Sequence, residues 1–437
     1  MKTEQRVITM LVIISDLHFT DGTTSNKAGQ KDLFNISPEA FRLFYAKIAN
    51  IVERRQELIK KVTFVYNGDI FDPLRTYVWF NVPQNQRPWS VPLVSSDVRK
   101  TCNQILKSII THNDEALAWL NGTHPDFENI WQVGQTIRRI YIPGNHDRII
   151  NLYEPCRRQV HQNLLNSSAS QVFENKFADA KHQTLVMHGH EADAFNCEFD
   201  LSGNPQYKAV PIGDPMTTML FALLGYRANF LPIPKEAKHR FRELDNVRPS
   251  LAAIRFIQNI ISDFNISNPV ASMIRRVVAE FEDLDFYRHW LQSHDRLNIG
   301  FDEADKLQLA LGAIKLLGAS VPSGLLEKLA ALVRDDACQQ LAQKMLAREA
   351  GGNLRYCVMG HTHEPVHTPL YVDQKRNIQK HYLNTGTFRT TFSQTFDRQN
   401  FLRFQRMSFA IIYGPNEFQP HEETPVYELW SGLRMHS

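Results

Sequence analysis

Short, uninterrupted apolar runs recur towards both ends of the chain. Each has four to eight residues and does not alternate with polar positions. This pattern is typical of strands that are covered on both faces. The runs are Val7–Ile14, Val62–Tyr66, Ile137–Ile142, Thr184–Met187 and Leu354–Met359.

The segment between the first two runs predicts a helix. Ser37 suits the N-cap position and Pro38 the first helical position, and an amphipathic pattern continues to about Lys61. A strand, a helix and a second strand in this order form a βαβ unit. The beginning of the chain therefore predicts an α/β fold.

The middle of the chain has helical periodicity and almost no strand-like runs. We therefore predict a core made of residues 1–204 and 351–437, interrupted by a helical insertion over residues 205–350. Four helical stretches are expected there: Ser250–Ser262, Pro269–Trp290, Glu303–Leu317 and Ser323–Ala347.

Two further segments depart from the alternation of strand and helix. Residues 73–129 predict an irregular insertion, because Pro83, Pro88 and Pro92 break its start. The end of the chain, over Arg403–Tyr413 and Pro425–Trp430, predicts a β-hairpin with a long loop.

Composition excludes extremes and names no function. The 437 residues are 43% hydrophobic and 22% charged, which excludes a disordered or collagen-like chain. The net charge of +3 is too small to indicate a nucleic-acid or membrane partner. The five scattered cysteines include no C-x-x-C pair, which favours a cytoplasmic protein with reduced thiols. No run reaches the roughly 18 apolar residues of a membrane span, and we interpret Val7–Ile14 as a strand rather than a signal peptide.

Each of the five apolar runs is followed at once by side chains that bind metals. Ligands in open α/β sheets gather beyond the carboxyl ends of the strands, so these five loops are expected to converge. The side chains are Asp16 and His18, Asp69 and Asp72, Asn145 with His146 and Asp147, His188 and His190, and His361 and His363.

The spacing of these side chains suits a metal site. Residues i and i+2 of an extended segment point the same way, so Asp16 and His18 would reach one point together. Gly68, Gly144 and Gly360 allow tight turns just before the ligands. Carboxylate, imidazole and amide groups suit Mn, Fe, Co, Ni or Zn, and seven of them are enough for two metals that share a bridge.

Together the five polar blocks resemble the signature of the calcineurin-like metallophosphoesterase superfamily. The resemblance covers residues 7–191 and 354–413 and leaves out the helical middle. It implies a four-layer α/β/β/α sandwich of two mixed sheets. It also implies that one metal is held by Asp16, His18 and His363, the other by Asn145, His188 and His361, and that Asp69 bridges them. The segment Tyr382–Thr387 is similar to the strand and turn that follow the last block in this superfamily.

One branch of the superfamily differs from this chain at two positions. The bacterial lipid-A pyrophosphatases typically have arginine where this chain has His146, and an aspartate-bearing block where it has His190. Their substrate is therefore not assigned here. His190 is expected to support the ligands, to face substrate or to have a structural role.

The resemblance implies a hydrolase that acts on phosphoric esters with two divalent cations, manganese first among them. We expect hydrolysis of a phosphodiester, pyrophosphate or phosphomonoester by in-line attack of a metal-bridging hydroxide. His146 would protonate the leaving oxygen, oriented by Asp147 or Asp72. The alternatives are a DNA or RNA nuclease of the same superfamily and a metal-binding scaffold without turnover.

The substrate is expected to be a small phosphate ester or nucleotide, and the sequence does not indicate nucleic acid. Arg75, Arg148 and Arg389 follow the blocks closely and could contact phosphate, although a surface salt bridge is the simpler fate of each. The apolar run Met216–Pro234 could line a pocket of a capping insertion, but packing within the insertion explains it more simply. Acidic residues interrupt the basic positions of the insertion, which favours a solvated helix face for Lys235, Lys238, Arg240, Arg242, Arg248 and Arg255.

Overall fold

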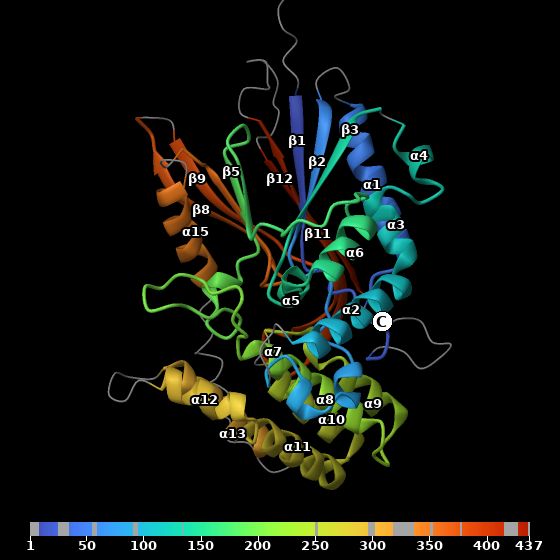
Figure 1. Cartoon of the computed structure of the whole chain (residues 1–437), viewed down its shortest axis with the longest axis vertical. Helices are drawn as coiled ribbons and strands as arrows, with labels where there is room; N and C mark the ends of the chain where they lie inside the picture. The colour runs from blue at the N-terminus through green and yellow to red at the C-terminus, as the bar shows by residue number, and fades with distance from the viewer. Residues whose placement is uncertain are drawn as a thin grey trace, which may run out of the picture.

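Two mixed β-sheets pack against each other, and helices cover their outer faces (Figure 1). The α/β/β/α sandwich is therefore confirmed. The computed structural model describes residues 8–24, 35–54, 59–90, 95–132, 134–249, 252–295, 302–317, 336–349, 353–375, 378–414 and 427–435.

The first sheet has seven strands in the order β3-β2-β1-β11-β10-β6, and β12 pairs with β11. The pairs β1–β2 and β2–β3 are parallel, whereas β1–β11 and β10–β11 are antiparallel. Its strands are β1 (Ile8–Ile14), β2 (Ile59–Asn67), β3 (Thr136–Ile142), β6 (Val247–Arg248), β10 (Phe388–Gln394), β11 (Phe401–Tyr413) and β12 (Tyr427–Met435).

The second sheet has five strands in the order β4-β5-β7-β9-β8. Its central pairs β5–β7 and β7–β9 are parallel. The strands are β4 (Lys176–Asp179), β5 (Thr184–Met187), β7 (Tyr356–Met359), β8 (Pro365–Asp373) and β9 (Ile378–Thr385). Aliphatic side chains of both sheets fill the space between them, among them Leu11, Ile13, Val65, Val186, Val358, Leu383 and Ile412.

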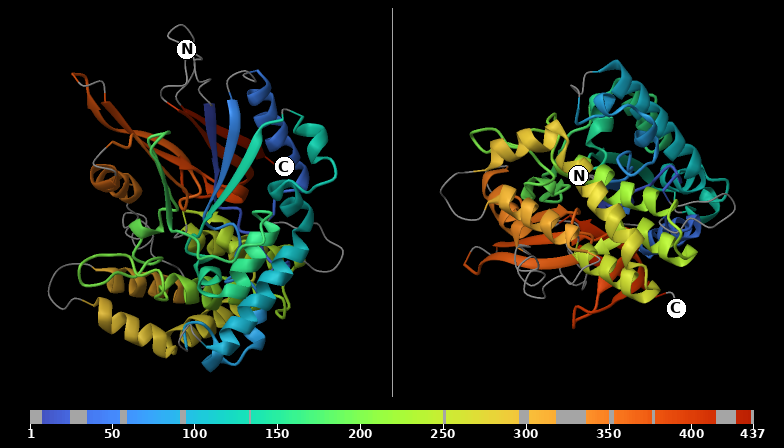
Figure 2. Two further views of the ribbon diagram at one scale, coloured as in Figure 1. Left: turned by 45° about the horizontal axis from the view of Figure 1, so that its top comes forward. Right: turned by 90° about the horizontal axis from the view of Figure 1, so that it is seen from below.

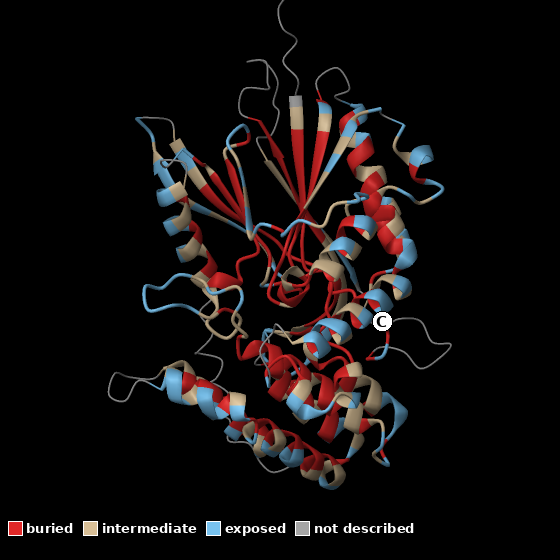
Figure 3. Ribbon diagram, in the orientation of Figure 1, coloured by how far each residue is buried: buried red, intermediate tan, exposed pale blue. Residues whose placement is uncertain are grey.

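Helices from the first half of the chain cover the first sheet, and α15 (Ala337–Arg348) covers the second (Figures 1 and 3). Helix α1 (Pro38–Glu53) buries Phe41, Phe44 and Tyr45, and the ring of Phe44 contacts that of Phe64 on β2. The other covering helices are α2 (Ser96–His112), α3 (Asp114–Asn121), α4 (Phe127–Ile130), α5 (Arg148–Leu152) and α6 (Glu154–Asn163).

Two local predictions in this half were wrong. Helix α1 ends at Glu53 rather than near Lys61, because residues from Ile59 onwards pair with β1 as strand β2. The expected irregular segment 73–129 is mostly helical from Ser96, since Pro83, Pro88 and Pro92 all stand before α2 and Pro125 lies between α3 and α4. The predicted C-terminal hairpin is confirmed by the antiparallel pairing of β11 with β12.

Most of the predicted insertion forms a helical layer across one end of the sandwich (Figure 2). It has its own core, in which Leu220, Leu223 and Leu224 are buried, as the packing interpretation expected. The expected helix Pro269–Trp290 is divided in two near Asp283. Residues 323–335 of the last expected helix lie outside the described residues. The helices are α7 (Gly213–Met216), α8 (Leu223–Ala228), α9 (Lys235–Arg242), α10 (Ala253–Phe264), α11 (Ser267–Glu282), α12 (Asp285–His294) and α13 (Glu303–Lys315), with a π-helical turn at Thr217–Ala222.

The insertion is tied to the core by a strand and by ion pairs. Val247 and Arg248 form β6, which pairs in parallel with Phe392 and Ser393 of β10. Just before this strand, Asp245 lies 3.1 Å from the guanidinium of Arg75. No described helix is both long and apolar enough to span a membrane.

Glu243, beside this junction, predicts a pH-dependent loss of stability. Burial raises the pKa of its carboxyl group from 4.5 to about 7, although Arg403 and Arg75 act to lower it. Between these two values the folded state holds a proton that the unfolded state has released. The free energy of unfolding therefore falls as the pH rises through this window. We expect Glu243→Gln to stabilise the protein at pH 8 by about 1–3 kcal/mol, and by less at pH 5.

Thermal unfolding at both pH values measures this effect. Glu280→Gln is the matched control, because the side chain of Glu280 is 45% exposed and pairs with Arg227. A Glu243→Gln variant that melts below the wild type at pH 8 would contradict the assignment.

Candidate metal centre

The loops that follow β1, β2, β3, β5 and β7 meet between the sandwich and the helical layer (Figure 1). They bring together all seven side chains predicted as metal ligands. Two neighbouring groups of histidine and aspartate could each hold a metal ion: Asp16, His18 and His363, and Asp69, His188 and His361.

In the first group, the Nε2 atom of His363 lies 3.0 Å from Nε2 of His18 and 3.3 Å from Oδ1 of Asp16. All three side chains are buried. In the second group, Nε2 of His188 lies 3.2 Å from Oδ2 of Asp69. Asn145 joins this group, because its Oδ1 atom lies 3.2 Å from Nδ1 of His361.

Asp69 lies between the two groups. Its Oδ2 atom is 3.5 Å from Nε2 of His18 and 3.2 Å from Nε2 of His188. Its Oδ1 atom accepts a hydrogen bond from the backbone N–H of His146 at 2.8 Å, which leaves Oδ2 to face both groups. Burial raises the pKa of Asp69, but the nearby His188 and His146 outweigh burial and hold it well below the usual range. One oxygen of Asp69 thus lies within 3.5 Å of a histidine from each group.

The spacing of these atoms fits a metal. Nitrogen and oxygen ligands bound at about 2.1 Å lie about 3.0–3.4 Å from one another around one cation. Four contacts within the groups, at 3.0–3.3 Å, are of this length. Nε2 of His18 lies farther from Oδ1 of Asp16, at 3.8 Å. His188 adds a second sign, since its Nε2 atom is buried without a hydrogen-bond partner among the described residues. Buried polar atoms normally have a partner, and a metal ion bound at Nε2 of His188 would supply one.

Hydrogen bonds behind three of the histidines set the nitrogen that faces the centre. Nδ1 of His18 lies 3.1 Å from Asp72 and Nδ1 of His188 lies 2.9 Å from the carbonyl of Asn67. For His361 the roles are reversed, since Nε2 lies 3.3 Å from Asp193. An acceptor on the remote nitrogen fixes the proton there and leaves the other lone pair for a metal.

The backbone of the centre is strained at its ligands. Asp16, His18, Asp69, His361 and His363 have φ angles between +48° and +70°, the left-handed region that side chains other than glycine rarely adopt. Each such residue costs about 1–3 kcal/mol, and such costs concentrate at functional sites. The sequence did not reveal this, because it predicted extended geometry around Asp16 and His18.

Two of the predicted glycines are required by close approach. A Cβ atom on Gly144 would lie 2.6 Å from the backbone nitrogen of Asp69. One on Gly360 would lie 2.3 Å from the carboxylate of Asp16. Only hydrogen at these positions lets the loops carry their ligands together.

His146 lies at the accessible edge of the centre. Its Nδ1 atom is 3.0 Å from Oδ1 of Asp72, and its ring contacts that of His18 edge-on. Burial lowers the pKa of His146, but Asp72 and Asp69 outweigh burial and raise it to about 10. Asp72 thus orients both His146 and His18.

Asp147 does not contact the ring of His146. Its two oxygens accept hydrogen bonds from the backbone N–H groups of Ile70, at 2.9 Å, and Gly144, at 2.6 Å. Asp147 therefore holds the two ligand loops against each other. Of the two orienting residues that the sequence predicted for His146, the structure places Asp72 in contact with it.

His190 lies behind the ligands rather than among them. It is buried against Glu191 and Tyr207, and neither of its nitrogens has a hydrogen-bond partner among the described residues. Burial lowers its pKa to about 4. His190 is therefore uncharged near neutral pH, and it belongs to none of the groups that could hold a metal.

The three arginines that the sequence singled out are buried rather than paired on the surface. Arg148 lies 2.7 Å from Asp214 of the insertion. Arg75 and Arg389 converge on Asp245 and Asn246.

Sequence reasoning missed Arg248. It belongs to the basic positions predicted to be solvated, yet its Nη2 atom lies 2.9 Å from Nδ1 of His363. It also missed Asn196, which accepts a hydrogen bond from Asn145 at 3.0 Å and so aims the amide oxygen at the centre. Asn196 and Asp193 follow the fourth block by only a few residues, a signal that could have marked them.

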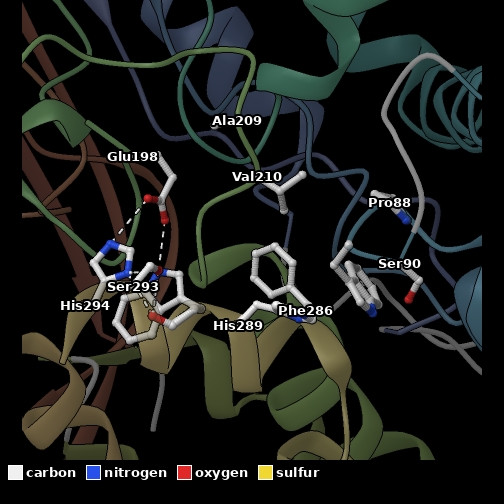
Figure 4. A pocket seen from close by; sticks show the side chains of 11 residues that line it. Pro88, Ser90, Glu198, Ala209, Val210, Phe286, His289, Ser293 and His294 are labelled. Atoms are coloured by element: carbon white, nitrogen blue, oxygen red, sulfur yellow. Dashed lines mark hydrogen bonds and ion pairs between the residues drawn. The ribbon is translucent and has the colours of Figure 1, made fainter. Parts of the chain in front are cut away.

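A cavity of about 720 Å³ lies between helix α12 and the loop that carries Asn196 (Figure 4). Phe286 and Trp290 line one side, and Pro88 and Trp89 line another. Glu198, which accepts a hydrogen bond from Trp290, is two residues from Asn196. Three aromatic side chains, Trp89, Phe286 and Trp290, line the cavity, and none of the predicted metal ligands is among its lining residues.

Comparison with protein-family models and with curated proteins finds no match to this chain.

Proposed function

We propose that the protein is a metal-dependent phosphoesterase with a dinuclear centre. The observation that carries the proposal is the pair of buried ligand groups on either side of Oδ2 of Asp69. The similarity of the five motif blocks to calcineurin-like metallophosphoesterases supports it. When bound, the two cations would lower the pKa of a water molecule and polarise a phosphoryl oxygen.

The donor set favours a borderline divalent cation. Imidazole and carboxylate groups make up both ligand groups, Asn145 adds an amide to the second, and no thiolate is among them. Such a set suits manganese, iron or zinc better than calcium. Manganese is our first candidate.

In this proposal, residues of the chain protonate the leaving group and bind the rest of the substrate. His146 stands at the accessible edge with its proton held by Asp72, where it can reach a leaving oxygen. The cavity beside helix α12, lined in part by aromatic side chains, offers room for the part of the substrate that is not phosphate. A small phosphate ester with an apolar or planar group fits both features.

Hydrolysis of bis(p-nitrophenyl) phosphate tests the proposal. We expect turnover in Mn²⁺ that disappears after chelation and returns when Mn²⁺ is added back. The p-nitrophenyl monoester and a single-stranded DNA digest, run beside it, separate diesterase, monoesterase and nuclease activity. A wild-type protein that binds two metals and cleaves none of these substrates would contradict the proposal.

Gly144→Ala should disrupt metal binding although it replaces none of the predicted ligands. The added methyl group would overlap Asp69, so the bridging carboxylate must move. We expect the bound manganese to fall from two ions towards one or none, measured by elemental analysis after gel filtration. Gly312→Ala is the matched control, since nothing lies within 4 Å of its added Cβ. If Gly144→Ala still binds two ions tightly, the close approach of residue 144 to Asp69 is not needed for metal binding.

A further inference from the structure

The helical layer contributes a guanidinium to the edge of the metal centre. Arg248, on strand β6, is held in place by the carbonyl groups of Asp245 and Val247, which accept from its Nη1 atom at 2.8 and 2.9 Å. Its Nη2 atom lies 2.9 Å from Nδ1 and 3.2 Å from Nε2 of His363. His363 is the one predicted histidine ligand whose remote nitrogen faces a donor instead of an acceptor.

This contact and a metal compete for the same atom. Arginine has only N–H donors, and a neutral imidazole has one nitrogen that accepts while the other carries a proton. An imidazole that accepts from Arg248 therefore has no second lone pair to offer a metal. Nε2 of His363 is also the atom that lies nearest to His18 and Asp16 in the first ligand group. One lone pair cannot serve a guanidinium and a cation together, and the two positive charges repel. A cation on Nε2 therefore displaces Arg248.

Two other guanidinium groups, those of Arg75 and Arg389, share Asp245, which is close to Arg248 in the sequence. Arg75 and Arg389 are buried, and both donate to the side chain of Asn246. Asp245 is the carboxylate they share, at 3.1 Å from Arg75 and 3.8 Å from Arg389. Asp245 is thus the carboxylate that pairs with these guanidinium groups, while the charges of Asp16 and Asp72 act on Arg248 and Arg389 from the metal centre.

Arg389 carries donors that nothing uses. Its Nε and Nη1 atoms have no hydrogen-bond partner among the described residues, although the side chain is only 1% exposed. Burial and the charges of Arg75 and Arg248 lower its pKa to about 9, despite Asp245. Buried guanidinium donors without a hydrogen-bond partner are the chemistry that recognises a phosphoryl group.

We propose that Arg248, with Arg389 behind it, forms a subsite for a second phosphoryl group next to the one that is cleaved, and that cation binding at His363 releases Arg248 for this task. The substrate class is then a phosphoanhydride, or another ester with two adjacent phosphoryl groups. This inference rests on the proposed function for the cleaved phosphoryl group only.

Binding of phosphonates that cannot be hydrolysed tests the subsite. In the full chain at matched free Mn²⁺, calorimetry should show methylenediphosphonate bound at least tenfold more tightly than methylphosphonate. Arg248→Met should remove most of this preference, and Arg248→Lys should retain part of it. Arg227→Met is the matched control, because Arg227 pairs with Glu280 on the surface of the insertion. An unchanged preference in Arg248→Met would overturn the proposal.

Metal affinity gives a second readout of opposite sign. In the metal-free protein, Arg248→Met removes a competitor for His363, so the first Mn²⁺ should bind threefold or more tightly. A purely structural arginine would weaken metal and diphosphonate binding together, and that result would overturn the proposal. Failure of the proposed function is distinguishable, since the wild type would then bind methylenediphosphonate yet leave bis(p-nitrophenyl) phosphate intact.

Discussion

Asp69→Asn should abolish turnover of bis(p-nitrophenyl) phosphate, with a loss in kcat of about 10³-fold or more. The substitution keeps the size of the side chain but removes the negative charge that lies between His18 and His188. A neutral amide is a poor bridge between two cations. We therefore expect the manganese content to fall from two ions to one, measured on the same sample as kcat.

Asp200→Asn is the control for this substitution. Asp200 makes hydrogen bonds within its loop, with Asn204, but is exposed and belongs to none of the groups that could hold a metal. Its activity and metal content should match the wild type. An Asp69→Asn variant that keeps both ions and more than a tenth of the activity would remove Asp69 from the bridging position.

His146→Gln should lower kcat by about 10²–10⁴-fold on a diester with an alkyl leaving group. Glutamine can still make hydrogen bonds in the pocket but cannot deliver a proton. The p-nitrophenolate ion needs little protonation, so the loss on bis(p-nitrophenyl) phosphate should be tenfold or less. The measurement is the ratio of the two losses, taken at saturating substrate.

The two manganese ions should stay bound in this variant, because His146 approaches Asp69 through its backbone N–H and contacts Asp72 through its ring. His124→Gln serves as the control, since His124 stacks on Trp119 away from the centre. Equal losses on good and poor leaving groups would refute an acid role for His146.

The sequence predicted the meeting of the ligand loops because local patterns encode it. Buried strands such as Thr184–Met187 read as continuous apolar runs, and the side chains just beyond them must gather at one sheet edge. The same logic placed Asp16, Asp69 and His188 together. The end of a strand can be recognised in the local sequence. The pairing of strands in the sheet then places the residues that follow each strand side by side.

The arginines and the supporting residues could not be predicted in this way. Arg248 reaches His363 only because β6 pairs with β10, a contact between segments about 145 residues apart. Nothing near Arg248 in the sequence distinguishes it from the neighbouring basic residues. Asp72 contacts the ring of His146, whereas Asp147 accepts from the backbone of Ile70. These different roles depend on how the loops after β2 and β3 pack, which the spacing of the residues does not encode.

The pairing of β6 with β10 restricts how the helical layer can move. A cap hinged only at its two ends could swing away as a whole. Here the chain is hydrogen-bonded into the sheet at Val247 and Arg248, in the middle of the layer. Any opening of the helical layer therefore turns about this strand. Helices on either side of it can shift while the backbone of Arg248 stays paired with β10 beside the metal centre.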